Sequence, residues 1–444
     1  MHDLVLRGGT VVSPDGQQRA DVAIDGEHIT AITHEVPGGR REIDATGLTI
    51  FPGMIDVHVH FNEPGRADWE GAATGSRALA AGGGTIFFDM PLNSTPCTVT
   101  PQDFDNKRTA LEAASICDFA LWGGLTPGSI SAMGEMAQRG VVGFKAFMCD
   151  SGLPEFPRAD DLTLLEGMRE AARCGLPVAV HAESEEITRG LTKRLLAGGS
   201  NSILAISAFL ESRPVIAEVE AIRRAGVLAR ETGCKLHIVH ISSGKGVAAA
   251  LEARGDGADI SIETCPHYLF FTDADLRRMG ALAKCAPPLR QYQDRESLWT
   301  AVLQDHVEII GSDHSPCPPA MKNRENFFEV WGGIAGVQAT LPVLVQEGVY
   351  GRHLRLEQIA ALTSANAARR FRVGTGTRAD FVLVDLAGYT RFSEQTLLHR
   401  HRASPYNGCK MHGAIRHTIR RGEVIFSEGA VTAVTNGKLV RPNE

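Results

Sequence analysis

The sequence predicts an α/β protein, a closed (β/α)8 barrel of the TIM type with a small β-sandwich satellite domain built from both chain ends. Between Met54 and about Ala365, eight short apolar runs alternate with longer stretches of helical periodicity. Short strand-like runs broken by turns occupy the two ends of the chain. We therefore expect residues 51–374 to form the catalytic barrel, and residues 1–50 and 375–444 to form the satellite. A doubly wound open sheet is the alternative.

The expected elements follow from these patterns in chain order. The N-terminal unit has apolar runs at 4–6, 10–12 and 22–24, interrupted by Gly8-Gly9 and by a turn at Pro14-Asp15-Gly16. Barrel strands are expected at 54–60, 84–90, 117–122, 141–147, 177–182, 235–241, 259–264 and 307–313. Covering helices are expected at 69–81, 160–174, 211–233 and 333–347. Strand texture returns at 379–385 and 415–426.

Composition narrows the class of partner. The 444 residues are 43% hydrophobic and 22% charged, and the net charge of -7 comes without a long run of one sign. Nucleic acid and anionic membranes are therefore not expected partners, and small molecules are. The polar N-terminus and the lack of a long apolar run favour a cytoplasmic protein. Nine cysteines without a C-x-x-C pair indicate reduced thiols.

The run from Met54 to His60 carries the first chemical signal. Strand alternation places Asp56, His58 and His60 on one face and Ile55, Val57 and Val59 on the other. In a barrel the two imidazoles would point inward near the end of the strand where active sites lie. The same spacing in His399-Arg400-His401-Arg402 lacks a strand context and carries two guanidinium groups. We interpret that segment as a solvated surface.

Other expected strands also end in polar groups on otherwise apolar runs: Lys145, His181, His240 and Asp313. Any one of them is consistent with a hydrogen-bonded core residue. Together with His58 and His60, however, they make six such groups at strand ends, and this number favours a metal centre. Lysine is cationic at neutral pH and repels metals. Lys145 would be a ligand only as a carbamate formed with carbon dioxide; an ion pair with a carboxylate is the alternative.

These residues and their order resemble the amidohydrolase superfamily, in its cyclic-amidase branch of dihydroorotases, hydantoinases and allantoinases. The resemblance covers nearly the whole chain and also includes His181-Ala182-Glu183, Glu263-Thr264-Cys265-Pro266-His267 and Gly311-Ser312-Asp313-His314. It implies two divalent metal ions, bridged by carbamylated Lys145. One ion would be held by His58, His60 and Asp313 and the other by His181 and His240. Zinc is the default, and cobalt, manganese or iron also suit nitrogen and oxygen ligands.

The implied chemistry is hydrolysis of a ring amide. Two cations lower the pKa of a shared water and polarise the carbonyl. Asp313 is placed as the catalytic residue that accepts the proton of the nucleophile and returns it to the leaving nitrogen. His240 suits the sixth-strand ligand better than His237, because three residues along a strand place the two on opposite faces. Asp56 is expected either to orient a metal-binding histidine or to make a structural hydrogen bond, and His267 is expected to be structural.

Loop residues narrow the substrate. Dihydroorotases carry an arginine at the Asn62 position for a substrate carboxylate, and hydantoinases carry a tyrosine where this chain has Asp150. The remaining segments resemble the allantoinase family: 62–66, 69–71, 89–94, 149–152, 312–318 and 331–336. They imply hydrolysis of allantoin to allantoate. Candidate contacts for the ureido group are Asn62, Asn93, Asp150, Ser151 and Cys285, each of which also suits a turn or loop.

Two alternatives to an allantoin-hydrolysing enzyme remain open at this point. A hydantoinase or dihydropyrimidinase would act on a simpler cyclic ureide. A non-catalytic scaffold relative would have no chemical reason to keep all six candidate ligands. By analogy with the superfamily, whose members are often tetramers, we expect a homo-oligomer such as a tetramer.

Overall fold

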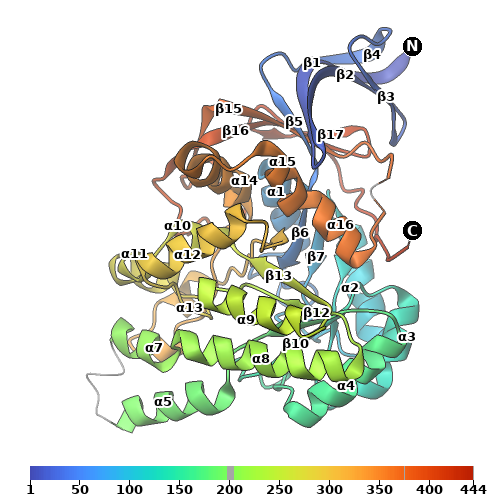
Figure 1. Cartoon of the computed structure of the whole chain (residues 1–444). Helices are drawn as coiled ribbons and strands as arrows, with labels where there is room; N and C mark the ends of the chain where they lie inside the picture. Colours follow the sequence, from blue (N-terminus) through green and yellow to red (C-terminus); the bar gives the residue numbers. More distant parts are fainter. Residues whose placement is uncertain (198–204, 375, 444) are drawn as a thin grey trace.

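The computed structural model describes residues 1–197, 205–374 and 376–443. It confirms the predicted class, because a barrel of alternating strands and helices carries a separate sheet built from the two chain ends (Figure 1). The expected boundary between residues 374 and 375 falls at a position outside the described residues. No helix in the described ranges is both long and apolar enough to cross a bilayer.

The barrel strands lie within or beside the predicted runs. They are β6 (Met54–Val59), β7 (Gly84–Asp89), β8 (Asp118–Leu121) with β9 (Gly123–Gly124), β10 (Phe144–Phe147), β11 (Val178–His181), β12 (Leu236–Ile238), β13 (Ile260–Thr264) and β14 (Ile309–Ile310). Their pairings are parallel, in the orders β6-β7-β8 and β9 through β14. The ring closes where His60 N donates to His314 O at 2.8 Å, beside a parallel bridge from Val59 to His314.

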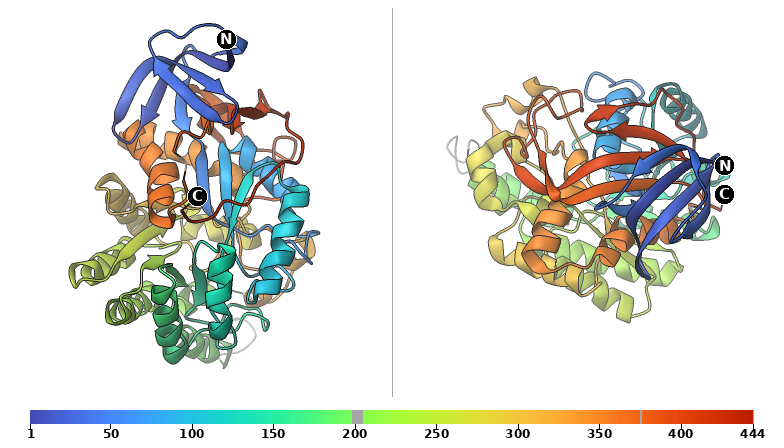
Figure 2. Two further views of the ribbon diagram at one scale, coloured as in Figure 1. Left: turned by 90° about the vertical axis from the view of Figure 1, so that its right-hand side faces the viewer. Right: turned by 90° about the horizontal axis from the view of Figure 1, so that it is seen from above.

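The helices cover this ring and its two ends (Figure 2). They are α1 (Ala72–Ala81), α2 (Pro101–Ala114), α3 (Met133–Arg139), α4 (Asp161–Arg173), α5 (Glu185–Ala197), α7 (Ile206–Ser212), α8 (Val215–Thr232), α9 (Gly244–Gly255), α10 (Pro266–Phe270), α11 (Asp273–Met279), α12 (Tyr292–Leu303), α13 (Pro319–Lys322), α14 (Thr340–Val343), α15 (Leu356–Ala360) and α16 (Asn366–Phe371). Short 3-10 segments (Ile130–Ala132, Gly280–Ala283, Phe327–Glu329, Val337–Ala339) and π-helical segments (Leu344–Tyr350, Ala361–Ala365) complete them.

Two helix predictions were wrong in their bounds. The expected helix at 211–233 is divided into α7 and α8 at Arg213-Pro214, because proline lacks an N–H and disfavours helical backbone in the residue before it. The expected helix at 333–347 begins only at Val337, because the preceding residues form a loop that Lys284 and Lys322 hold through backbone contacts to Gly333.

The satellite sheet joins both ends of the chain. Its strands are β1 (His2–Ser13), β2 (Gly16–Asp25), β3 (His28–Thr33), β4 (Gly39–Asp44), β5 (Thr49–Pro52), β15 (Phe381–Arg391), β16 (Lys410–Arg420), β17 (Glu423–Ser427) and β18 (Ala430–Val431). The two ends meet at the antiparallel pair of β5 and β15, over a shared apolar cluster. The expected break at Gly8-Gly9 is instead a register irregularity within β1.

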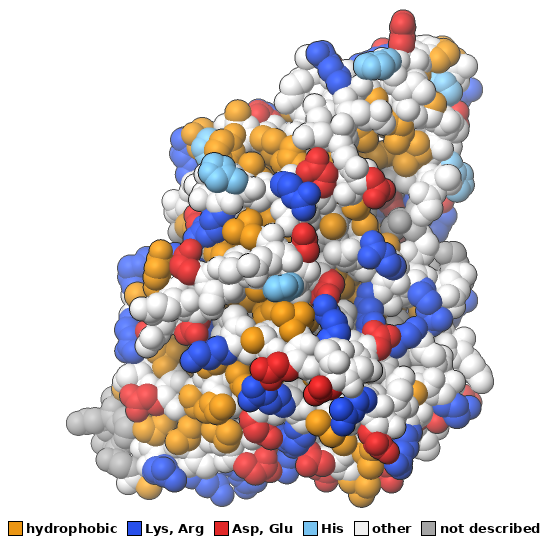
Figure 3. Space-filling model, in the orientation of Figure 1, with side chains coloured by type: hydrophobic (Ala, Val, Ile, Leu, Met, Phe, Trp, Pro, Cys, Tyr) orange, Lys and Arg blue, Asp and Glu red, His pale blue; other side chains and the backbone are white. Residues whose placement is uncertain are grey.

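The surface carries charges of both signs. On the face drawn in Figure 3, basic and acidic side chains are interspersed, and neither sign forms a continuous field.

The C-terminal tail leaves the satellite sheet and packs against the barrel. Phe119 N of β8 donates to Lys438 O at 3.0 Å.

Strand β6 departs from simple alternation. Ile55 and Val57 belong to the apolar cluster that contains Trp122 and Phe371, whereas Val59 packs in the cluster that contains the α1 side chains. The expectation that these three residues share one face was therefore wrong. Pairing with β7 is irregular between Asp56 and Val59, which reorients the end of the strand that carries the histidines.

Candidate metal centre

His58, His60 and Asp313 meet where the first and last barrel strands close the ring. His58 Nε2 and His60 Nε2 lie 3.3 and 3.4 Å from the same Oδ1 atom of Asp313. The ligand atoms of the three side chains lie within 4.8 Å of one another. Burial alone would raise the pKa of Asp313, but electrostatic interaction with the His58 ring and the His60 hydrogen bond lower it below its ordinary value. An ionised carboxylate and two imidazoles are a donor set that suits a divalent cation.

His181 and His240 form a second, adjacent group. His181 Nδ1 lies 3.1 Å from His240 Nε2, and the His58 and His240 rings are 5.4 Å apart between centroids. Burial lowers the pKa of His58, His181 and His240, which favours neutral imidazoles with a lone pair available for a cation. Four imidazoles and one carboxylate thus form a continuous cluster at the ends of β6, β11 and β12.

Lys145 reaches this cluster from β10. Its side chain is buried, and Nζ has no hydrogen-bond partner among the described residues. Burial lowers the pKa of Lys145 to about 8. Its ring contact is Phe147, with Nζ 5.0 Å from the centroid. An ion pair with a nearby carboxylate, the alternative considered for this lysine, is not formed in the described part of the chain within the 4.0 Å limit for such pairs.

Glu263 supports the first histidine from behind. Its carboxylate accepts hydrogen bonds from His58 Nδ1 at 2.9 Å, His237 Nε2 at 3.0 Å and the His240 backbone N–H at 3.2 Å. Burial alone would raise the pKa of Glu263, but electrostatic interaction with the His58 ring and the hydrogen bonds from His237 and His58 lower it to about 2. With Nδ1 bonded to Glu263, His58 presents Nε2 to the cluster.

Asp56 makes structural hydrogen bonds, which is the second of the two roles predicted for it. Its Oδ1 accepts from the backbone N–H groups of His58 and Ser312, at 3.2 and 3.0 Å, and so joins the first and last strands. Burial raises the pKa of Asp56 to about 7. The Glu263 role was missed by sequence reasoning. Sequence reasoning quoted Glu263 within a motif, as a charged residue on the apolar run 260–264, but gave it no role.

Glu183 supports His181 in a similar way. Glu183 Oε2 lies 2.8 Å from His181 Nε2 and also pairs with the Arg213 guanidinium. Burial alone would raise the pKa of Glu183, but the Arg213 charge and the His181 hydrogen bond lower it to about 2. Because Glu183 takes Nε2, His181 Nδ1 is the atom that faces His240. Sequence reasoning quoted Glu183 within a motif but gave it no role.

The five candidate substrate contacts separate into three groups. Asn62 and Asn93 both have left-handed backbone, with φ of 64° and 70°, and their amides lie 3.4 Å from Pro316 O and 3.5 Å from Ser315 Oγ. Both therefore face the loop that follows Asp313.

Asp150 and Ser151 are engaged in their own turn. Asp150 Oδ1 accepts from Gly152 N at 3.0 Å, and Ser151 Oγ donates to Phe156 O at 2.7 Å. Asp150 is also exposed. Cys285 is buried beside Asp313, and burial raises the pKa of its thiol to about 12. The turn and loop roles thus account for the bonds of Asp150 and Ser151.

Three further buried histidines lie outside the proposed ligand set. His237 is buried and bonds Ser261 and Glu263. His267 is buried, and burial lowers its pKa to about 4. His399 was expected in a solvated segment, and this was wrong. It is 2% exposed and its ring packs 5.7 Å from that of His314, because the segment docks on the loop around Glu70.

The cluster fits a pair of cations. Lys145 Nζ is buried here and has no hydrogen-bond partner among the described residues. A buried amine without a partner is rare, and beside four imidazoles and a carboxylate it indicates a site built for a charged group. The donor set contains nitrogen and oxygen atoms and no required thiolate.

Comparisons with known proteins identify the family of the chain. A model of the amidohydrolase family matches residues 49–425. A curated allantoinase of Solibacter usitatus is 61% identical over 448 residues, covering 100% of this chain and 97% of the relative. An allantoinase of Rubrobacter xylanophilus is 52% identical, with 99% and 98% covered.

Solved structures place the fold in the same group. An L-hydantoinase (dihydropyrimidinase) from Arthrobacter aurescens superposes with a TM-score of 0.95 at 31% identity, covering 99% of this chain and 100% of that one. A dihydropyrimidinase from Brevibacillus agri gives 0.91 at 28% identity, covering 99% and 98%. The chain therefore belongs to the amidohydrolase family and, within its cyclic-amidase branch, to the allantoinases.

Proposed function

We propose that this enzyme hydrolyses the ring amide of allantoin to give allantoate. The observation that carries the proposal is the agreement of the whole chain with curated allantoinases at up to 61% identity. The cluster of imidazoles, lysine and carboxylate at the carboxyl ends of the barrel strands is suited to metal-dependent hydrolysis.

We propose that His58, His60 and Asp313 hold one divalent ion, that His181 and His240 hold the other, and that Lys145 joins them. When bound, the ions would activate water and polarise the substrate carbonyl. Zinc is the default, with cobalt, manganese and iron as alternatives that the nitrogen and oxygen donors also accept. Glu263 and Glu183 would fix which ring nitrogen of His58 and His181 faces each ion.

The proposed bridge requires a change of charge on Lys145. The ammonium first loses one proton. The neutral amine then attacks carbon dioxide, an N–C bond forms as one C=O π bond opens, and a second N–H proton leaves, so that the original cation becomes an anion with two oxygens. Two features of the site support this step. Burial lowers the pKa of Lys145 to about 8, and Nζ has no hydrogen-bond partner among the described residues to keep it as an ammonium.

Asp313 is the proposed acid and base. Its Oδ1 faces both His58 and His60, and it follows the strand that closes the barrel. The carboxylate would take the proton of the nucleophile and return it to the departing ring nitrogen. Asn62 and Asn93, whose amides contact the following loop, are the proposed contacts for the ureido group. Their neutral amides suit an uncharged ring better than an anionic one.

A hydantoinase or dihydropyrimidinase activity is the second candidate, because the similar solved structures carry those names. The position that holds a tyrosine in hydantoinases is Asp150, whose side chain is exposed and bonded within its own turn. The test compares turnover of allantoin, unsubstituted hydantoin and dihydrouracil by the metal-loaded enzyme. Higher kcat/KM for either simpler ring would contradict the allantoin assignment. Absence of stoichiometric metal after supplementation would favour the non-catalytic scaffold.

Lys145→Ala tests the bridge. We expect loss of turnover that short-chain carboxylic acids partly restore, because a free carboxylate supplies the missing bridging oxygens. Lys284→Ala is the matched control, since Lys284 is also buried but its Nζ donates to the carbonyls of Phe327 and Val330. Its loss should reduce stability without rescue by acids. Full turnover of Lys145→Ala without added acid would reject the bridge.

We propose that the enzyme forms a homo-oligomer such as a tetramer. Large apolar side chains are exposed on two packed helices: Leu162 of α4 at 62%, and Ile216 and Val227 of α8 at 57% and 56%. Light scattering coupled to gel filtration would measure the assembly. A cytoplasmic location remains a prediction, which cell fractionation would test.

A further inference from the structure

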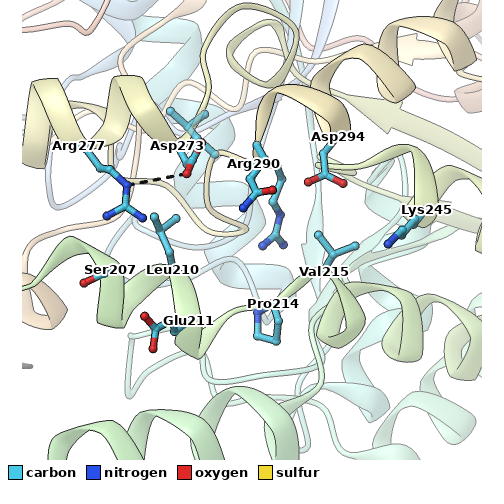
Figure 4. A pocket seen from close by; sticks show the side chains of 12 residues that line it. Ser207, Leu210, Glu211, Pro214, Val215, Lys245, Asp273, Arg277, Arg290 and Asp294 are labelled. Carbon is cyan, nitrogen blue, oxygen red and sulfur yellow. Dashed lines mark ion pairs between the residues drawn. The ribbon is translucent and has the colours of Figure 1, made fainter.

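A second cavity, separate from the candidate metal centre, opens between the α7–α8 junction and the starts of α11 and α12. Its volume is about 480 Å³, within the range of small-molecule sites of about 300–1,000 Å³. Apolar side chains line part of it, including Leu210, Val215 and Leu289. Figure 4 shows the Arg290 guanidinium among them. The first residues of the 18-residue helix α8 also line the cavity, and a helix start favours negative charge.

Arg290 lines this cavity, and one of its guanidinium nitrogens has no hydrogen-bond partner among the described residues. It is 8% exposed, its Nε donates to Ser242 Oγ at 2.9 Å, and its Nη1 donates to Arg213 O. Nη2 is buried and has no hydrogen-bond partner among the described residues. Two bonds therefore fix the plane of a guanidinium whose remaining donor lacks an acceptor. A buried donor in this state is costly unless a ligand satisfies it.

The remaining charges around the cavity define the class of ligand. Lys245 and Arg277 add positive charge, whereas Glu211, Asp273 and Asp294 add three carboxylates. Asp273 lies 3.9 Å from Arg277. A multiply charged anion would be repelled by the carboxylates. A ligand with one carboxylate for Arg290 and several N–H donors for the acidic groups would match both signs.

We propose that this cavity is a second binding site for a ureido-substituted carboxylate, the class to which the ring-opened product belongs. The choice of the product rests on the proposed function, but the site for a carboxylate does not. Arg290 would bind the carboxylate, and the acidic groups at the rim would accept from the ureido N–H groups. The apolar floor would cover the carbon skeleton.

Equilibrium dialysis of the metal-loaded enzyme with radiolabelled allantoate tests the proposal. We expect two sites per chain. Gln291→Trp, at an exposed residue that lines the cavity, should fill it and leave one site. Gln293→Trp is the matched control, because Gln293 is equally exposed two residues later but does not line the cavity. It should retain both sites. Loss of the same site in both variants, or in neither, would overturn the proposal.

A second pair of variants tests whether the charge around the cavity, and not only its shape, contributes to binding. Arg277→Glu should weaken the Gln291-sensitive site about 10-fold, whereas Arg278→Glu, next along α11 and outside the cavity, should not. Inorganic phosphate and acetate are the competing probes. If either displaces allantoate from that site as well as unlabelled allantoate does, the ureido-carboxylate assignment is overturned. If allantoin is not hydrolysed but the Gln291-sensitive site persists, the proposed function fails and the cavity assignment stands.

Discussion

Glu263→Gln should weaken metal binding without unfolding the barrel. The native carboxylate accepts three hydrogen bonds, from His58 Nδ1, His237 Nε2 and the His240 backbone. The amide keeps one oxygen for His58 but turns an N–H group toward another donor and removes the negative charge. A hydrogen bond to a charged group contributes about 1.5–3 kcal/mol and a neutral one about 0.5–1.5 kcal/mol. The difference of about 1–1.5 kcal/mol for the His58 bond corresponds to metal binding about 5- to 13-fold weaker, and the usual loss on removing such a partner is about 10- to 100-fold.

Competition with a chromophoric chelator would measure this affinity on the purified enzyme, with kcat followed in parallel. Glu218→Gln is the matched control. Glu218 is also buried and accepts three bonds, from Ser242 N, Ser242 Oγ and Ser243 Oγ, but none from a candidate ligand. It should lower the unfolding free energy and leave metal affinity unchanged. An affinity change in Glu263→Gln below about threefold would refute the reasoning.

Three further outcomes follow from other contacts. Asp118→Asn should cost about 1.5–3 kcal/mol in denaturant unfolding, because partly buried Arg378 and buried Arg421 lose their shared carboxylate and keep only their separate pairs with Asp380 and Glu27. Burial lowers the pKa of His399 from 6.5 to about 4, so the unfolded chain takes up the proton first as pH falls. The stability this histidine contributes above pH 6.5 should therefore be lost toward pH 4, by about 2 kcal/mol at pH 5, and His399→Gln should flatten that slope in urea midpoints. Gly65→Ala should abolish turnover, because a Cβ would lie 2.1 Å from Thr95 O.

Each of these has an internal control. Asp385→Asn, which loses a half-exposed pair with Arg416, should cost under about 1 kcal/mol. His401→Gln, two residues away at a partly exposed position, is the matched variant for the urea midpoints. Gly152 also has positive φ but an added Cβ there meets nothing within 4 Å, so Gly152→Ala should cost only about 1–2 kcal/mol. Equal effects in any pair would contradict the contact assigned.

The barrel could be predicted because each strand carries its own local signal. The apolar runs that end at Lys145, His181 and Asp313 are visible without knowledge of their neighbours, and the fold brings their ends to one side. The division of 211–233 was also visible, since Pro214 interrupts the helical pattern. The irregularity in β6 was not, because it depends on how the strand pairs with its neighbours.

The supporting carboxylates could not be assigned from sequence. Glu263 is 205 positions from His58 along the chain, and their contact depends on the stagger of the closed ring. The same holds for His399, whose burial depends on where the C-terminal segment docks. Charged residues on buried strands were the available signal, and their partners required the three-dimensional arrangement.

The junction of β6 and β14 has a consequence for the order of assembly. Asp56 links His58 and Ser312 across that junction, so the first and last candidate ligands, His58 and Asp313, meet only when the final strand has been added. A nascent chain that ends before Asp313, and so lacks residues 313–444, would have no complete first site. Metal capture would then come late in biogenesis, and released fragments would not compete with the finished enzyme for scarce ions.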